Sequence, residues 1–346
     1  MKKTKMKLML LCFVMVLACV FVGCGNKDSA DDTQDDTQLQ STESTEVQEV
    51  VVETPGNKNL LTGLPTLTEE ALEKAKFTPC QAQEVATIGF APLFGPHTPY
   101  HFSTGPHFFF KLTEESKLLP SSVVKANLQE LTDAKEIELK RQLKKSEKEA
   151  LKAAVTNKLL AQAFATRRDF LIWCNTDKNI VGISVTSAKR AERALALLRE
   201  AFSTFPAKLL TPRCLVDERI TTWLTQNTLP EKFKYGSETT LKSKDEDGGV
   251  IRASKEDLTS EEIAVHLQAG KVATEIGLNF EDSIEFTLTQ EIALKKIKLA
   301  DIYVEKNLPK SGDDEIADAQ AELVLQGELF EQLSDYLLEI FDCDRA

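Results

Sequence analysis

The sequence lacks the short motifs on which most nucleotide-binding and hydrolytic enzymes depend. It contains no GxxxxGK[ST], GxGxxG, HExxH or GxSxG element, so phosphate-binding loops, dinucleotide sites, zinc-peptidase helices and nucleophile elbows are missing their residues. Carboxylates are numerous, but none stands in an apolar setting that would identify a general acid and base. We therefore expect a protein that is not an enzyme and that uses no cofactor.

Paired cysteines and clustered metal ligands are also missing. Three of the seven cysteines lie in or directly after the apolar N-terminal run, and the other four are widely spaced without a CxxC pair, so free thiols are expected. His97, His101 and His107 share one proline-rich loop, and the His-x3-His spacing suits zinc in principle. No acidic or cysteine ligand stands close by, so we expect no metal site.

Positive charge is scarce overall, with 42 Lys and Arg against 54 Asp and Glu and a formal net charge of -12. The deficit is uneven along the 346 residues. Residues 25–56 hold nine acidic residues against one Lys, and residues 313–346 hold eleven against one Arg. Residues 135–193 reverse the balance, with fourteen Lys or Arg against seven Asp or Glu. An acidic chain with a basic middle suggests an anionic partner for that middle.

The N-terminal residues 1–24 have the design of a secretory signal, with lysines ahead of an unbroken apolar run and small residues before a cysteine. Their end, FVGC, resembles a bacterial lipoprotein box in which Cys24 carries the lipid, and Cys19 is a weaker alternative. An uncleaved anchor or a mis-assigned start remains open. Residues 25–57 are polar, acidic and repetitive, which predicts a solvated, disordered tether.

Helical and extended patterns are interspersed from residue 58 to 346 without a regular βαβ period, which predicts an α+β fold. A capping box from Thr259 to Glu262 is expected to open a helix. Residues 316–341 form either a strand and a helix or one long helix. The other elements we expect are strands at 86–95 and 107–113, a hairpin at 169–187 with its turn at 176–179, a helix at 188–202, and a strand pair at 282–304.

Residues 121–168 contain neither glycine nor proline, which predicts two or three helices that project if little else packs on them. Lysines recur every four residues in this region and would form a stripe about 18 Å long on one helix. Like charges at this spacing are mutually unfavourable, so the stripe suggests an anionic ligand, although a merely solvated helical face remains the alternative. The stripe consists of Lys140, Lys144, Lys148 and Lys152, flanked by Arg141 and Lys145.

Six segments, in order between Lys58 and Phe341, resemble the RdgC family of bacterial recombination-associated proteins: FTPCQAQEVATIGF, KLLPSSVVK, LKKSEKEALK, AQAF, SAKRAERALALLRE and EDGGVIRASKEDLTSEEIAVHLQAGKVATEIGL. The resemblance implies a horseshoe subunit with central mixed sheets, a projecting helical finger at about 115–168 and a tip region. It also implies a homodimer that closes as a ring around double-stranded DNA, with little sequence preference, and that antagonises RecA. The resemblance further implies a cytoplasmic, nucleoid-associated protein without catalytic activity.

The resemblance also suggests which side chains meet DNA. Phe164 matches the aromatic residue at the end of the finger and is expected to be exposed. Gln162 stands where the family often has Arg, which weakens the expected phosphate contact at the tip of the finger. Arg167 and Arg168 either compensate for it or are ordinary surface arginines. The basic residues that match the family's finger are Arg141, Lys144, Lys145 and Lys148, with Lys140 and Lys152 extending the run.

Two departures from the family pattern bear on function. The usual aromatic-rich first strand is missing, and NLLTGLPTLTEE resembles the entry to an unrelated lipoprotein domain, so the N-terminal part resembles a graft. The hairpin TLTQEIALKKIKL also lacks the family's glycine-containing turn. The competing function is therefore a membrane-anchored envelope lipoprotein whose folded domain is a binding or scaffold module, which requires processing of the leader and lipidation of Cys24.

Overall fold

The computed structural model describes the backbone of residues 15–20 and, beyond it, residues 67–343 except 186, 203–204, 206, 246–247 and 309–313. The predicted tether at 25–57 lies outside the described residues. The described helices are α1 (Glu69–Lys74), α2 (Ser121–Leu139), α3 (Lys145–Gln162), α4 (Ala188–Phe202), α5 (Val216–Gln226), α6 (Glu261–Gln268), α7 (Asp301–Asn307) and α8 (Glu315–Ile340).

The described strands form one hydrogen-bonded network in the order β2-β4-β5-β6-β1-β12-β11-β10-β8-β9, with β3 beside β4 and β7 beside β1. All pairs of named strands are antiparallel. The predicted α+β class is confirmed, but the expectation of mixed sheets is wrong for these strands, because neighbours such as β5–β6 and β11–β12 are joined by short connections that reverse the chain. The strands are β1 (Met15–Val20), β2 (Ala86–Ala91), β3 (His101–Thr104), β4 (His107–Lys117), β5 (Ala165–Asn175), β6 (Ile180–Ser184), β7 (Ala207–Leu209), β8 (Phe233–Ser243), β9 (Val250–Ser254), β10 (Lys271–Phe280), β11 (Ile284–Thr289) and β12 (Ala293–Leu299).

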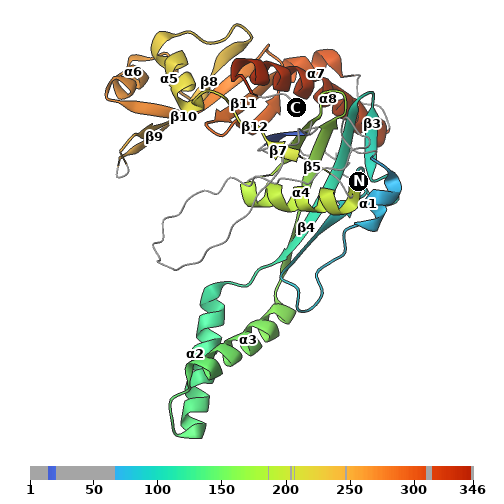
Figure 1. The fold of residues 1–346 in the computed structure, drawn as a ribbon, viewed down its shortest axis with the longest axis vertical. Coiled ribbons are helices and arrows are strands. Elements are labelled where there is room, and N and C mark those ends of the chain that lie inside the picture. Colours follow the sequence, from blue (N-terminus) through green and yellow to red (C-terminus); the bar gives the residue numbers. More distant parts are fainter. Residues whose placement is uncertain are drawn as a thin grey trace, which may run out of the picture.

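Strand β1 comes from the segment whose sequence predicts a leader. It lies between β6 and β12 and thereby joins two half-sheets, β2 to β6 and β12 to β9 (Figure 1). Among the described residues, no helix has both the length and the apolar composition needed to cross a bilayer.

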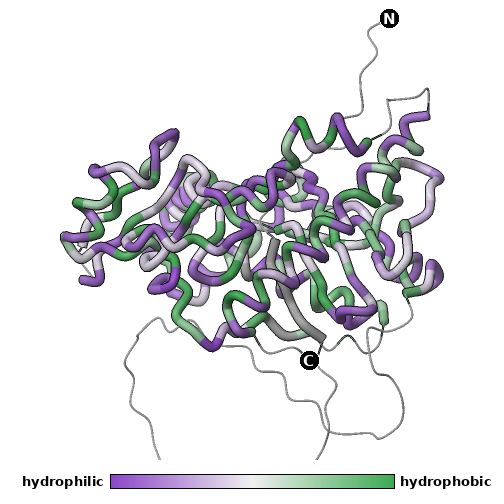
Figure 2. Tube along the Cα trace, turned by 90° about the horizontal axis from the view of Figure 1, so that it is seen from above, coloured by the Kyte–Doolittle hydropathy of each residue, from purple (hydrophilic) through white to green (hydrophobic). Residues whose placement is uncertain are grey.

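The first half-sheet is covered on both faces. Side chains alternate along its strands, so Phe110 and Ile172 belong to the core under α4, while Phe109 and Trp173 belong to the core under α8. Helix α4 presents the apolar face that its periodicity predicts, because Ala191, Ala194, Leu195 and Leu198 are buried. Hydrophobic and hydrophilic residues alternate along much of the trace (Figure 2).

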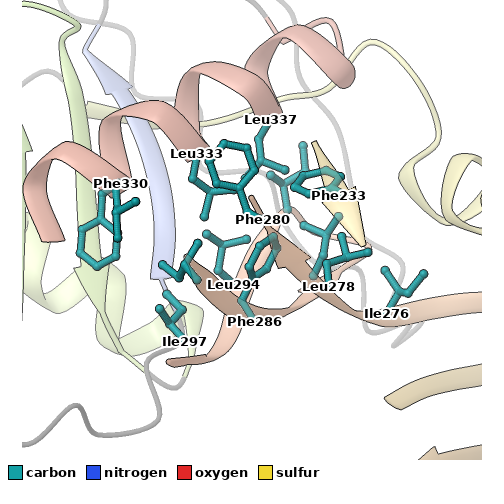
Figure 3. Packing of buried hydrophobic residues seen from close by; sticks show 14 of the residues in the cluster. Phe233, Ile276, Leu278, Phe280, Phe286, Leu294, Ile297, Phe330, Leu333 and Leu337 are labelled. Carbon is teal, nitrogen blue, oxygen red and sulfur yellow. The ribbon is translucent and has the colours of Figure 1, made fainter. Parts of the chain in front are cut away.

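The second half-sheet packs its apolar face against α8. Leu333 and Leu337 of the helix face the strands β10, β11 and β12 (Figure 3), while Phe330 packs edge-to-face against Trp173 of β5. Phe233 of β8 packs edge-to-face against Phe280 of β10 with ring centroids 5.8 Å apart. Burial of these aromatic and aliphatic side chains, at about 25 cal/mol per Å² of apolar surface, is the main force holding α8 on the sheet.

The structure confirms the predicted hairpin turn and the long C-terminal helix but not the predicted helix cap. The hairpin turn at 176–179 is confirmed, and residues 316–341 fall almost entirely in the single helix α8. The capping box from Thr259 to Glu262 is wrong, because α6 takes Ser260 as its N-cap and the Thr259 hydroxyl donates to Asp257. The hydrogen bond to Asp257 occupies the Thr259 hydroxyl, and Ser260 makes no side-chain capping bond of its own.

Candidate nucleic-acid interface

A helical hairpin projects from one end of the body and forms the finger that the sequence predicts (Figure 1). It consists of α2 and α3 and is inserted between β4 and β5, which pair along their full length from His107↔Asn175 to Lys117↔Ala165. The Leu118 N–H donates to the Phe164 carbonyl over 2.7 Å and closes the base of the hairpin. Leu143 of the turn and Leu151, Val155 and Leu160 of α3 are buried, as is Thr132 of α2.

The lysine stripe is not continuous, so the prediction that Lys140 to Lys152 share one helix is wrong. Helix α2 ends at Leu139, and Lys140 is its C-cap in the left-handed conformation, with φ of 52°. Helix α3 starts at Lys145 with Lys144 as its N-cap. Lys145, Lys148 and Lys152 therefore form a shorter stripe, about 10 Å long, and Lys140 and Lys144 lie in the turn at the far end of the finger.

The turn between α2 and α3 contains neither glycine nor proline, the usual signals of a helix end. Two glutamates stabilise it instead. Glu136 accepts from the Leu143 N–H over 2.9 Å, and Glu147 accepts from the Lys144 N–H over 2.8 Å. Each satisfies a backbone donor that a continuous helix would have paired internally. Glu147 stands three residues after the N-cap, which is the position of the reciprocal glutamate in a capping box. That spacing is the signal by which the turn could have been found.

The same two glutamates hold two of the predicted DNA-binding cations. Arg141 donates to both carboxylate oxygens of Glu147, at 2.9 and 2.7 Å, and this pairing lowers the Glu147 pKa to about 2 while it raises that of Arg141. The Lys148 ammonium lies 3.2 Å from Glu136. The hydrogen bond from the Leu143 N–H is the largest cause that lowers the Glu136 pKa, and Lys148 lowers it further. Arg141 and Lys148 therefore have structural partners in the free protein.

The four other lysines of the predicted DNA-binding run have no ion pair among the described residues. Lys140, Lys144, Lys145 and Lys152 are exposed, and their ammonium groups meet no carboxylate within ion-pair distance in that part of the chain. Residues 121–162 carry nine Lys or Arg and six Asp or Glu, a net charge of +3 on a chain of -12. An anionic ligand reaches these four lysines without breaking an ion pair of the described structure, and the same holds for Lys125, Lys135 and Lys158 elsewhere on the finger.

Phe164 is exposed, as expected, with 86% of its surface accessible. It lies at the base of the finger, between the C-cap of α3 and β5, and not at the tip. Gln162, the last residue of α3, is at the same end, so the position where the family often has Arg lies at the base of the finger and not at its tip. Leu118 lies across the base and is 56% exposed. The two side chains give the base of the finger exposed apolar surface.

Arg167 and Arg168 lie within β5, which starts at Ala165, before the hairpin predicted at 169–187. Arg167 pairs with Glu115 of β4, and its guanidinium lies 5.3 Å from the centroid of the Phe77 ring. Arg168 is exposed and makes no ion pair among the described residues. The structure thus gives Arg167 a packing role and leaves Arg168 available beside the finger.

Sequence reasoning missed a buried polar cluster that ties α8 to β4 and β5. Trp173 donates its indole N–H to Nδ1 of His107 over 3.2 Å, and Nε2 of His107 lies 3.3 Å from Glu331. Glu331 also accepts from Asn175 over 2.9 Å. The partners are up to 224 residues apart in the sequence, so no local pattern could have indicated them.

The cluster favours the neutral form of His107. Because the indole occupies Nδ1 as a donor, the ring proton must sit on Nε2 and point to Glu331. Burial lowers the His107 pKa, and the carboxylates of Glu331 and Glu328 offset this only in part. Since the folded pKa is below the unfolded one, this interaction stabilises the fold above the unfolded pKa and is lost as the pH falls through the folded value.

The three histidines of the proline-rich loop do not converge. His101 pairs through Nδ1 with Glu69 over 2.6 Å, while His107 joins the cluster at α8. In the part of the chain that the structure describes, no three His, Cys, Asp or Glu side chains are grouped so as to hold a metal ion. Nor does any cysteine there take part in a disulfide.

Comparison with known proteins places most of the chain in one group. A family model described as "Putative exonuclease, RdgC" matches residues 61–343. The recombination-associated protein RdgC of Yersinia pestis strain Pestoides F is 36% identical over 273 residues, which is 78% of this chain and 90% of the relative. That of Psychromonas ingrahamii is 34% identical over 279 residues, or 80% and 92% of the two chains.

Proposed function

Because the chain belongs to the RdgC family of recombination-associated proteins, we propose that it binds double-stranded DNA without sequence preference. Binding by phosphate neutralisation needs exposed cations whose charge is not already neutralised by the protein. Lys140, Lys144, Lys145 and Lys152 on the finger meet this requirement.

The geometry of α3 suits a duplex backbone. Lys145 and Lys152 are seven residues apart on one helical face, which is about 10 Å along the axis. Measured along the duplex axis, that distance corresponds to about three phosphates of one strand, which rise by about 3.4 Å each. The observation that carries the proposal is this pair of unpaired lysines on a projecting arm of an otherwise acidic protein.

We further propose that two subunits close as a ring around the duplex and so limit RecA-dependent strand exchange. A finger that extends from one side of the body encloses DNA only when a second copy completes the circle. Phe164 and Leu118 supply exposed apolar surface at the finger base that a second subunit would cover. A ring also adds a topological barrier to dissociation and shields the enclosed duplex from invasion.

Three measurements on the full chain test these proposals. Sedimentation at micromolar concentration should give twice the mass of the 38.5 kDa chain, less any removed leader. Fluorescence anisotropy should give equal affinities for two duplexes of unrelated sequence. In a RecA assay, strand exchange should be inhibited in proportion to the fraction of the duplex that the protein covers. A strict monomer with no affinity for duplex DNA would overturn both proposals.

We propose action by binding and not by catalysis, although the matching family model carries the word exonuclease in its description. Incubation of end-labelled linear duplex with the protein and Mg²⁺ distinguishes the two. Intact DNA after prolonged incubation supports binding alone. Release of labelled nucleotides that increases with protein concentration, and that co-elutes with it through purification, would establish a nuclease.

DNA binding requires a cytoplasmic, nucleoid-associated protein, whereas the leader favours a membrane-anchored lipoprotein. Cell fractionation of wild type and Cys24→Ser separates the two locations. Soluble, nucleoid-associated wild type supports the DNA-binding proposal. Membrane-bound wild type that Cys24→Ser releases would support the lipoprotein alternative, with the folded domain as a binding or scaffold module.

A further inference from the structure

Strand β1 is the one link between the two half-sheets among the described strands. On one side it pairs with β6, from Met15↔Ser184 to Cys19↔Ile180. On the other side it pairs with β12, at Met15↔Leu294, and with β7, at Cys19↔Lys208. In the described network β7 pairs with β1 alone. Without β1, β6 and β12 would both become edge strands and β7 would lose its partner.

The strands that flank β1 lie inside the core. Ile180, Val181 and Ile183 of β6 are buried, as is Leu294 of β12. Backbone N–H and C=O groups at such positions have no access to water, so they need a hydrogen-bonding partner within the protein. An unfilled space between β6 and β12 would leave two rows of these groups unpaired. The fold therefore requires an extended segment at this position.

We propose that the space between β6 and β12 is a strand-binding site whose ligand is the chain's own leader segment, Met15–Val20, so that the folded protein keeps its leader. The segment MVLACV has no glycine or proline and spans about 20 Å when extended. These same features make it the apolar centre of a secretory signal. The segment can serve either as a cleaved signal or as strand β1, but not as both, because cleavage before Cys24 removes β1 from the chain.

The proposal concerns the fold and does not depend on DNA binding. Its first test is hydrogen exchange of the full-length wild-type protein, combined with the intact mass of the folded fraction. We expect the chain to begin before Met15 and the amides of β1 to exchange slower than in an unfolded peptide by a factor on the order of 10³ or more. A folded protein that begins at Cys24, or β1 amides that exchange at unprotected rates, would overturn the proposal.

Cross-linking tests the register independently. The pairing places Cys19 opposite Ile180, whereas Ile183 lies opposite Val16. Mild oxidation of full-length Ile180→Cys should give a disulfide between Cys19 and the new thiol, detected as a linked peptide after proteolysis. Ile183→Cys is the matched control, since it is equally buried on the same strand but is not opposite a cysteine. Equal linkage of Cys19 in both variants, or in neither, contradicts the pairing of β1 with β6.

Discussion

The salt dependence of DNA binding should identify which finger lysines contact phosphates. Lys145→Gln with Lys152→Gln removes two exposed cations that have no ion pair in the described structure. Each phosphate contact contributes about 0.9 to the slope of log K against log salt, so the double variant should lower the slope by about 1.8 per engaged subunit. Between about 50 and 200 mM salt, the wild type should then lose roughly tenfold more affinity than the variant.

The matched control removes the same charge elsewhere. Lys234→Gln with Lys298→Gln also deletes two exposed lysines, but in the second half-sheet, where each is already paired with an aspartate. Fluorescence anisotropy with two unrelated duplexes should show a slope close to that of the wild type for this control. Circular dichroism should be unchanged in both double variants.

A finer comparison uses one helix. Lys148→Gln should change the slope less than Lys145→Gln, because the Lys148 ammonium already lies 3.2 Å from Glu136 and a phosphate would have to displace that carboxylate. The reasoning is refuted if the Lys145 and Lys152 double variant keeps the wild-type slope, or if the control at Lys234 and Lys298 flattens it equally. The finger stripe would then be a solvated face.

Three further predictions follow from the geometry. Phe164→Ala should change the free energy of unfolding by less than about 0.5 kcal/mol while weakening the dimer in sedimentation, whereas Leu160→Ala, at a site only 3% exposed, should cost about 2–5 kcal/mol in urea unfolding. The free energy of unfolding should fall as the pH is lowered from about 7 to about 5.5, and His107→Gln should reduce this dependence, because the buried neutral ring is protonated more readily when unfolded. Glu147→Gln should steepen the dependence of log K on log salt more than Glu149→Gln does. Both variants raise the net charge by one, but only Glu147→Gln releases the Arg141 guanidinium from a bidentate pair. Equal slopes would show that the Arg141 guanidinium does not reach DNA.

Local patterns in the sequence were enough to predict much of the architecture. The apolar periodicity of 188–202 predicts the buried face of α4, because side chains four residues apart meet on one side of a helix wherever the helix lies. The alternating segments around residues 176–179 predict the β5–β6 hairpin for a similar reason. Six ordered segments were enough to indicate the family, which the comparisons confirm.

The candidate site was predictable only in part. The basic character of the finger and the exposure of Phe164 were foreseen, but the single long stripe was not what formed. Lys140 adopts a left-handed conformation that costs a non-glycine residue about 1 kcal/mol or more, and two glutamates seven and three residues from their backbone partners offset that cost. Repetition every four residues describes a helix but does not show where side-chain caps end it.

By itself, the sequence determined the elements whose signals are local: helix faces, hairpin turns and the basic finger. Only the tertiary structure decided which side chains are already paired, such as Arg141 with Glu147, because an ion pair depends on where two elements come together. It also decided the place of Met15–Val20, which has the composition of a signal segment and the pairing of a central strand. Apolar β-branched residues suit a bilayer and a buried sheet equally well, and only neighbouring strands with unpaired backbone groups distinguish the two.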